Sequence, residues 1–184
     1  MFHKPRKLVG IALILLSVSL LLGCAQPATA PAPAPDQPVV RPWMDIELTD
    51  VTTGEKFKIS DFKDKTILLE SFAVWCPTCL AQQKEMQKFQ ASHGDDVIHI
   101  SLDTDPNEDA EKVREHIQRN GLDWYFAISP IELTEALIDE FGLKFVNAPR
   151  APVVLICKDG SARFLRSGVK PAEELAAEVA QGCE

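Results

Sequence analysis

The sequence has few of the features that mark several common protein classes. It carries 19 Lys and Arg residues against 27 Asp and Glu, for a formal net charge of −8 at pH 7. This balance argues against a nucleic-acid binder, which usually has a basic face. Five cysteines are too few for a small domain framed by disulfides, so each cysteine suggests a specific use. No internal repeat is visible, and the 184 residues are enough for one packed domain with appendages.

The first 23 residues have the pattern of an export signal. A basic start precedes an apolar run over residues 8–22, and the run ends in Leu21-Leu22-Gly23-Cys24. This ending resembles the lipobox of bacterial and archaeal lipoproteins, which implies that Cys24 is lipidated and becomes the mature N-terminus. The alternative is an uncleaved signal anchor, but the run is shorter than the roughly 20 residues of a spanning helix. Either way, we expect the domain on the extracytoplasmic face of a cell membrane.

Residues 24–42 form the expected tether. After Cys24 the segment is rich in Ala and Pro, a composition that cannot bury a core and favours an extended, semi-stiff chain. Its expected role is to hold the following domain, residues 43–184, clear of the lipid surface.

Patterns of apolar residues predict an α/β domain from Trp43 onward. Strands at 46–49 and 56–59 should form a hairpin, followed by a helical turn at 60–62. Further strands are expected at 66–73, 97–102, 124–128, 153–157 and 162–166, and helices at 77–92, 106–119, 131–141 and 171–180. Strands that alternate with helices and end in a hairpin indicate a layered α/β domain.

The stretch Trp75-Cys76-Pro77-Thr78-Cys79 lies between a predicted strand and a predicted helix. The free N–H groups and positive dipole end of a helix start favour a thiolate at Cys76. We expect Cys76 to be the exposed attacking thiol and Cys79 the more buried resolving thiol. Pro77 has no N–H and so removes one hydrogen bond to the Cys76 thiolate. A purely structural disulfide between these cysteines is disfavoured, because it would close too small a loop to stabilise much.

The element order, this motif and the later Pro-strand-Asp-Gly-strand pattern resemble the thioredoxin superfamily over roughly residues 43–182. The hairpin and tether make the chain similar to the TlpA/ResA group of extracytoplasmic thiol–disulfide oxidoreductases. The resemblance implies a thioredoxin fold, a central mixed β-sheet flanked by helices, with an N-terminal β-hairpin extension. It also implies that Pro152 is a cis-proline facing the dithiol, which makes Ala151–Pro152 the candidate cis bond, with Ala148–Pro149 as a competitor.

Further residues are candidates for the same site. Glu70 lies six residues before Cys76, at the place of the family's buried acid under the second cysteine, and burial would raise its pKa so that it could exchange a proton with Cys79. The alternative is an outward-pointing or structurally paired Glu70. His99 lies where thioredoxin carries a lysine near that acid, although most lone strand histidines are simply packed. Trp75 is expected either to shape the client-binding surface, together with Pro77 and Ala151, or to be a core tryptophan.

Three other functions fit the motif less well. A peroxiredoxin-like peroxidase would have a threonine three residues before its cysteine, where Ala73 stands. A copper-chaperone or other metal-binding module would need wider cysteine spacing with a histidine, or a second close cysteine pair. A non-catalytic interaction domain would usually have lost one cysteine of the motif. We therefore expect no cofactor and no bound metal.

If Cys24 is lipidated and Cys76 pairs with Cys79, Cys157 and Cys183 are left as a possible pair, and the expected compartment permits disulfides. Cys157 is most simply a buried thiol, and a Cys157–Cys183 bridge is the alternative. The expected partners are client proteins with thiols or disulfides, with no nucleic acid. The resemblance implies a reductant supplied by a membrane electron donor, while Pro77-Thr78 does not fix the direction of electron flow.

Overall fold

The computed structural model describes Met1 and residues 41–183. The rest of the predicted export signal, the predicted lipidation site Cys24 and nearly all of the predicted tether lie outside the described residues. Packed structure begins slightly before the predicted Trp43, because Arg41 bonds Glu140 at 2.7 Å and a short 3-10 helix follows at Pro42–Asp45. The Trp43 side chain is buried and donates its indole N–H to Glu140 at 2.5 Å.

The predicted elements are present, mostly with the predicted bounds. The strands are β1 (Leu48–Thr49), β2 (Lys56–Phe57), β3 (Thr66–Phe72), β4 (Val97–Asp103), β5 (Tyr125–Ile128), β6 (Val153–Ile156) and β7 (Ala162–Phe164). The helices are α1 (Pro77–His93), α2 (Ala110–Asn120), α3 (Ile131–Phe141) and α4 (Ala172–Gln181). Short 3-10 turns fill Ile59–Phe62, Gly94–Asp96 and Ala148–Arg150.

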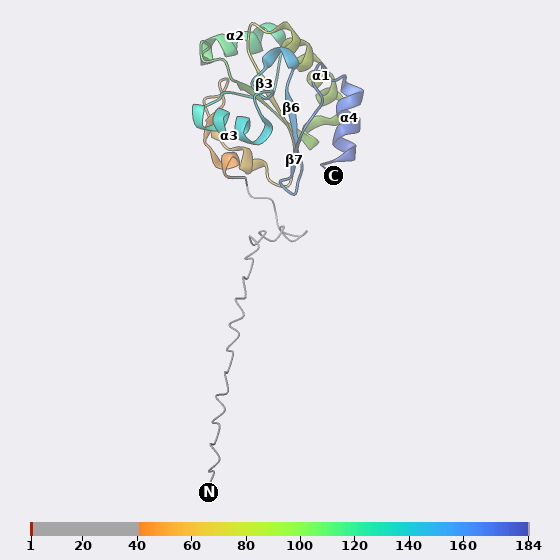
Figure 1. The fold of residues 1–184 in the computed structure, drawn as a ribbon. Helices are drawn as coiled ribbons and strands as arrows, with labels where there is room; N and C mark the ends of the chain where they lie inside the picture. The colour runs from red at the N-terminus through yellow and green to blue at the C-terminus, as the bar shows by residue number, and fades with distance from the viewer. Residues whose placement is uncertain (2–40, 184) are drawn as a thin grey trace. The chain divides into compact units, whose positions relative to one another are not determined.

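The sheet confirms the predicted thioredoxin-like fold. Its five strands run in the order β5-β4-β3-β6-β7, with β3, β4 and β5 parallel and with β6 antiparallel to both β3 and β7. The separate β1–β2 hairpin is antiparallel and precedes this sheet. Figure 1 shows α1 and α4 beside each other on one side of the sheet and α3 on the other.

Strand β3 crosses the centre of the sheet and sends alternate side chains to the two layers. Ile67 and Leu69 pack in the cluster that includes Leu133 and Leu137 of α3. Leu68 packs with Met86 and Phe89 of α1 and with Leu175 of α4. Because side chains alternate along a strand, Glu70 faces the α1 side with Leu68, and this places an acid beneath the helix that carries the cysteines.

Helix α2 begins later than the sequence predicts. Its predicted start was Pro106, but the side chain of Asp109 accepts hydrogen bonds from Glu111 N at 3.1 Å and Lys112 N at 2.9 Å, which caps the helix at Ala110. The helix ends as predicted at Gly121, whose φ of 59° is left-handed. Among residues 41–183, none of the helices is both long enough and apolar enough to cross a membrane.

Candidate active site: a dithiol above a buried acid

The two cysteines lie at the start of α1, just beyond the end of β3. Cys76 is the N-cap residue, and its sulfur accepts the backbone N–H of Cys79 at 3.2 Å. Pro77 occupies the first helical turn, where a missing N–H leaves no helix hydrogen bond unmade. The Cys76 and Cys79 sulfurs are 2.7 Å apart and not bonded, so only a small displacement separates the dithiol from a disulfide.

The prediction that Cys76 is exposed is wrong. Only 1% of its surface is accessible, against 0% for Cys79. The sulfur turns inward to cap the helix, and it lies in an apolar cluster with Phe72, Ala73 and Ala148. In this state a client disulfide can reach Cys76 only if the surrounding surface shifts.

The environment of Cys79 disfavours its thiolate. Its sulfur lies 3.1 Å from the carbonyl oxygen of Ala148, which can accept the S–H proton. Burial raises the pKa of Cys79 strongly, and the nearby negative charge of Glu70 and the contact with Cys76 raise it further. Cys79 is therefore a protonated thiol at neutral pH, and it needs a base before it can attack.

Glu70 is fully buried within β3, as predicted. Its Oε2 accepts hydrogen bonds from the Ser101 hydroxyl at 2.8 Å and from Gln83 Nε2 at 3.2 Å. Burial raises the pKa of Glu70 to about 7, while these two hydrogen bonds and the positive charge of Lys170 act in the opposite direction. A carboxyl group with a pKa near neutrality can both accept and return a proton at physiological pH.

His99 does not meet Glu70. In the β3–β4 register, Glu70 lies opposite Ser101, while His99 lies opposite Leu68, two positions earlier. The ring of His99 packs between Phe89 and Trp124, and neither of its nitrogens has a hydrogen-bond partner. Burial lowers the pKa of His99 to about 4, so it is a neutral, packed imidazole.

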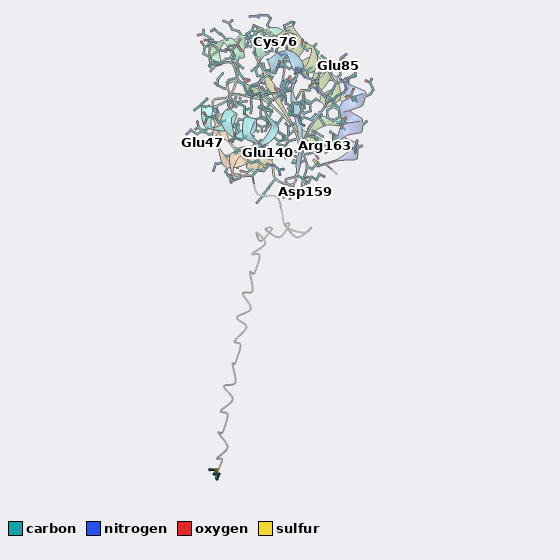
Figure 2. All side chains as sticks on the ribbon, viewed as in Figure 1. Glu47, Cys76, Glu85, Glu140, Asp159 and Arg163 are labelled. Atoms are coloured by element: carbon teal, nitrogen blue, oxygen red, sulfur yellow. A yellow bond between two sulfur atoms is a disulfide. The ribbon has the colours of Figure 1, made fainter. Side chains whose placement is uncertain are left out.

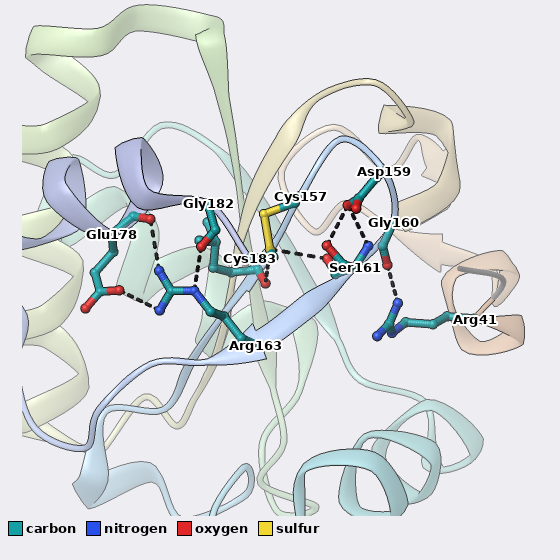
Figure 3. The surroundings of a disulfide bond; sticks show 10 residues. Arg41, Cys157, Asp159, Gly160, Ser161, Arg163, Glu178, Gly182 and Cys183 are labelled. Carbon is teal, nitrogen blue, oxygen red and sulfur yellow. Dashed lines mark hydrogen bonds and ion pairs between the residues drawn. A yellow bond between two sulfur atoms is a disulfide. The ribbon is translucent and has the colours of Figure 1, made fainter. Parts of the chain in front are cut away.

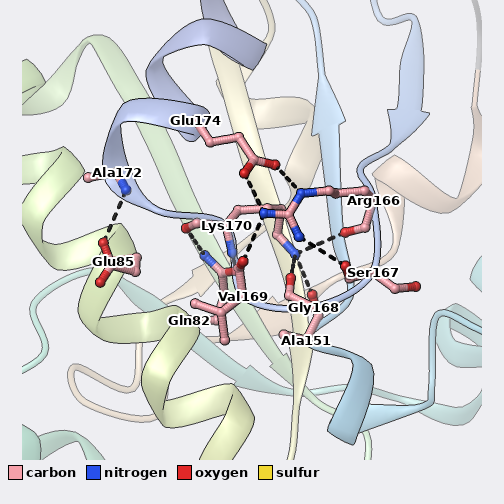
Figure 4. A network of polar contacts seen from close by, with 10 residues as sticks. All are labelled: Gln82, Glu85, Ala151, Arg166, Ser167, Gly168, Val169, Lys170, Ala172 and Glu174. Atoms are coloured by element: carbon pink, nitrogen blue, oxygen red, sulfur yellow. Dashed lines mark hydrogen bonds and ion pairs between the residues drawn. The ribbon is translucent and has the colours of Figure 1, made fainter.

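The cation near Glu70 comes from Lys170, which sequence reasoning missed. Its side chain is fully buried just before α4, and its ammonium donates to the carbonyl oxygens of Ala151 at 2.7 Å, Gly168 at 2.7 Å and Arg166 at 3.3 Å (Figure 4). Burial lowers the pKa of Lys170 to about 8, against the pull of Glu70. The segment Gly168-Val169-Lys170-Pro171 looks like an ordinary loop, so its sequence gives no signal for this role.

The predicted cis bond before Pro152 is also wrong. No peptide bond in the described part of the chain is cis, which covers both Ala151–Pro152 and Ala148–Pro149. The chain turns instead at Ala151, whose φ of 46° is left-handed and costs an alanine roughly 1–2 kcal/mol. The Lys170 ammonium on the Ala151 carbonyl helps to hold this turn. The Pro152 carbonyl accepts Ser71 N–H at 3.2 Å, beside Glu70, and the placement of Pro152 opposite the dithiol stays a prediction.

The loop between β3 and the dithiol is held by two carboxylates. Trp75 is 59% exposed, so it is not a core residue, and its indole N–H donates to Asp105 at 2.6 Å. One residue earlier, the backbone N–H of Val74 donates to Glu108 at 2.7 Å. These bonds fix the approach to Cys76 and leave a large aromatic surface beside it.

The second cysteine pair forms a disulfide at the other end of the domain. Cys157 and Cys183 are bonded with their Cα atoms 6.0 Å apart, so the bridge, not a free thiol, is the state of Cys157 (Figure 3). Because β6 runs antiparallel to β3, its last residues lie beside the first residues of β3, and Cys157 comes directly after them. Cys76 comes after the last residues of β3, so the two cysteine pairs lie at opposite ends of the sheet. Figure 2 accordingly shows Cys76 far from Asp159 and Arg163, which flank the bridge in Figure 3.

No cluster of three or more His, Cys, Asp or Glu side chains suited to a metal ion occurs among the described residues. The fold and the paired thiols together define a thioredoxin-like protein whose dithiol opens a helix above a buried acid. Residues 30–180 match the model of the Redoxin family, and the chain belongs to that family.

Among curated proteins, the thioredoxin-like protein YneN of Bacillus subtilis (strain 168) is 32% identical over 60 residues, or 33% of this chain. The match spans about a third of that relative, 35% of its length. Among solved structures, a secreted disulfide oxidoreductase of Mycobacterium tuberculosis, described as homologous to E. coli DsbE, superposes with a TM-score of 0.58 at 18% identity, covering 76% of this chain and 97% of that one. StoA of Bacillus subtilis superposes with a TM-score of 0.55 at 21% identity, and the match covers 71% of this chain and 92% of that one. These structures share the fold.

Proposed function

We propose that this protein is a thiol–disulfide oxidoreductase that exchanges disulfides with exported proteins through Cys76 and Cys79, acting as a reductant. One observation carries the proposal: two unbonded cysteine sulfurs 2.7 Å apart at the start of a helix, with a fully buried carboxyl group on the strand beneath. The similar proteins agree in class, since one is a disulfide oxidoreductase and another is a thioredoxin-like protein.

In the proposed cycle, the Cys76 thiolate attacks one sulfur of a client disulfide. A Cys76–client disulfide forms, the client S–S bond breaks, and the first client sulfur leaves as a thiolate that takes up a proton. Cys79 then loses its proton and attacks the Cys76 sulfur. The Cys76–Cys79 bond forms, the second client thiolate leaves, and two electrons have passed from the protein to the client. A membrane electron donor would restore the dithiol.

Glu70 supplies the base for the second step. Burial and the Glu70 charge keep Cys79 protonated, so its attack requires a proton acceptor nearby. The pKa of Glu70, about 7, means that a substantial fraction is ionised at neutral pH and can take this proton. The same raised pKa lets Glu70 return a proton when the disulfide is reduced again.

The direct test is reduction of insulin by the purified domain with dithiothreitol as electron source. We expect turnover in the wild type, none in Cys76→Ser, and accumulation of a client-linked species in Cys79→Ser. Glu70→Ala should slow release of that species and alter the pH–rate profile, and an unchanged profile would rule Glu70 out as the base. Turnover of hydrogen peroxide without insulin reduction would instead support a peroxidase, and stoichiometric copper or zinc would support a metal carrier.

We further propose that the protein works on the extracytoplasmic face of a membrane, held there by a lipid on Cys24. The leader pattern and the Cys157–Cys183 bridge support this location, because disulfides persist in oxidising compartments. The test is metabolic labelling with radioactive palmitate, followed by fractionation. We expect label and membrane association in the wild type and loss of both in Cys24→Ala, and an unlabelled wild type would refute the anchor.

A further inference from the structure

Two chains of hydrogen bonds converge on a single oxygen of Glu70. The first runs from Trp124 through Ser101, and the second runs from Asn120 through His116 and Gln83. Both end on Oε2 of Glu70, while Oε1 is buried and has no hydrogen-bond partner. Apart from Trp124 and Asn120, which begin the chains, every member is buried.

The direction of the first chain follows from its chemistry. The indole N–H of Trp124 can only donate, and it does so to the Ser101 hydroxyl oxygen at 2.9 Å. The Ser101 proton is thereby left to donate to Glu70 at 2.8 Å. Trp124 thus orients the hydroxyl group so that it presents its proton, and not a lone pair, to the carboxylate.

The second chain has the same direction. An ionised carboxylate only accepts, so Gln83 must turn its NH2 group toward Glu70 and its oxygen toward His116. His116 Nε2 lies 2.7 Å from that oxygen and must carry the ring proton. Its other nitrogen, Nδ1, can accept from the Asn120 side-chain amide at 3.4 Å. Burial lowers the pKa of His116, consistent with this neutral form.

We propose that Gln83 and Ser101 are positioning residues that hold Oε2 of Glu70 as a hydrogen-bond acceptor and leave Oε1 as the proton-exchanging oxygen. This inference rests on the proposed function. The Cys79 S–H bond breaks, its proton joins Oε1 directly or through one water, and the sulfur keeps the electron pair with which it attacks Cys76. His116 and Trp124 lie one hydrogen bond further from Glu70, and they fix the orientation of the two donors.

The physical effect is a lower proton affinity than burial alone would give. The two hydrogen bonds favour the ionised form of Glu70, and the ionisable groups that act on it electrostatically are Cys79 on α1 and Lys170 before α4. Since hydrogen bonds to a charged group are among the stronger ones, losing one should raise the titration midpoint of Glu70 by about one pH unit or more.

The test is direct titration of the Glu70 carboxyl carbon by NMR in glutamate-labelled protein, with the signal assigned by its absence in Glu70→Gln. Gln83→Met removes the donor while keeping the side-chain size. Gln82→Met is the matched control: this neighbouring buried glutamine bonds the Lys170 backbone N–H at 2.8 Å and carbonyl at 3.3 Å, and not Glu70. We expect the midpoint to rise by about one pH unit in Gln83→Met and to stay near the wild-type value in Gln82→Met.

An unmoved midpoint in Gln83→Met, or an equal rise in both variants, would overturn the inference. If Gln83→Met does not fold, Ser101→Ala removes the other donor and carries the same prediction. The titration needs no client and no turnover, so its outcome is separate from that of the proposed function. That function fails if Cys76→Ser reduces insulin as well as the wild type does.

Discussion

The two cysteine pairs of this chain lie at opposite ends of one sheet and have opposite surroundings. Cys76 and Cys79 are almost completely buried, and a carboxyl group and an ammonium group act electrostatically on Cys79. Cys157 and Cys183 are partly exposed and joined. Near them Arg163 holds the C-terminal turn through Glu178 at 2.6 Å and the Gly182 carbonyl at 2.6 Å (Figure 3).

This difference in surroundings separates a redox-active cysteine pair from a structural one. A redox-active pair needs one thiol that ionises, a second that is deprotonated on demand, and a proton acceptor within reach. The first pair has ionisable neighbours for this task. The second pair closes a loop of 26 residues and links the end of α4 to the end of β6, which stabilises the folded domain. The predictions below test this division.

The largest expected effect is loss of turnover when the proposed nucleophile is removed. Cys76→Ser should lower insulin reduction by roughly 10³-fold or more, because the alcohol is a far weaker nucleophile than a thiolate. The matched control is the double variant Cys157→Ser/Cys183→Ser, which should retain activity close to wild type at a temperature where it is folded. Comparable losses in the two variants would end the distinction between the pairs.

The reverse experiment concerns stability. Cys157→Ser/Cys183→Ser should lower the free energy of unfolding by about 3.5 kcal/mol, the chain-entropy value for a loop of this length. Cys76→Ser/Cys79→Ser should lower it by less, because no covalent cross-link is lost and a serine hydroxyl can still cap the helix. Urea denaturation of both variants measures this, and a larger loss at the dithiol would contradict the account.

Glu70 should make stability depend on pH. Its pKa in the folded protein, about 7, lies above its ordinary value of 4.5, so between these pH values the folded state keeps a proton that the unfolded state has released. Stability should therefore fall as pH rises through this window. Glu70→Gln should remove that part of the slope and be more stable at pH 8 by up to about 3 kcal/mol.

Denaturation of Glu70→Gln and wild type at pH 4.5 and pH 8 checks this sign. Asp103, whose pKa burial also raises to about 7, contributes to both proteins, so the difference between them isolates Glu70. A gap between the two proteins that does not widen toward pH 8 would show that Glu70 is not held protonated.

The smallest expected effect comes from the anchor of Trp75. Asp105→Ala frees the indole ring and also removes the two turn bonds that Asp105 accepts from Asn107, at 2.9 and 3.0 Å, and it should lower kcat/KM for a protein client by about threefold. Asp159→Ala is the matched control, because this aspartate makes a similar turn bond, to Ser161 N at 2.9 Å, beside the disulfide. Equal effects of the two variants would show that Asp105 acts only on general stability.

The sequence was sufficient for the fold and for the dithiol, because both leave local signals. Apolar periodicity marks the strands, and Trp75 to Cys79 stands at a strand–helix junction. Glu70 is identified by its place six residues before Cys76, where the resembled family carries a buried acid. The partners of Glu70 have no such local signal, because the contacts of Gln83 and Lys170 depend on how α1 and the segment before α4 pack on the sheet.

The errors have a similar origin. The prediction of an exposed Cys76 assumed that a nucleophile points outward, whereas the sulfur caps its own helix. Whether His99 meets Glu70 was left open, because the register of β4 with β3 is a long-range property, and this register places Ser101 opposite Glu70. The absence of a cis bond at Ala151–Pro152, next to a left-handed Ala151, is likewise not specified by any local sequence pattern.

The central claim, that one cysteine pair exchanges electrons while the other does not, is tested most directly by a redox titration read separately for each pair. The protein is equilibrated in glutathione or dithiothreitol buffers between about −120 and −300 mV, alkylated, and analysed by peptide mass spectrometry. We predict that Cys76–Cys79 passes reversibly from disulfide to dithiol within this range while Cys157–Cys183 stays oxidised. A shared transition for both pairs, or a Cys76–Cys79 pair that never changes state, would contradict the account.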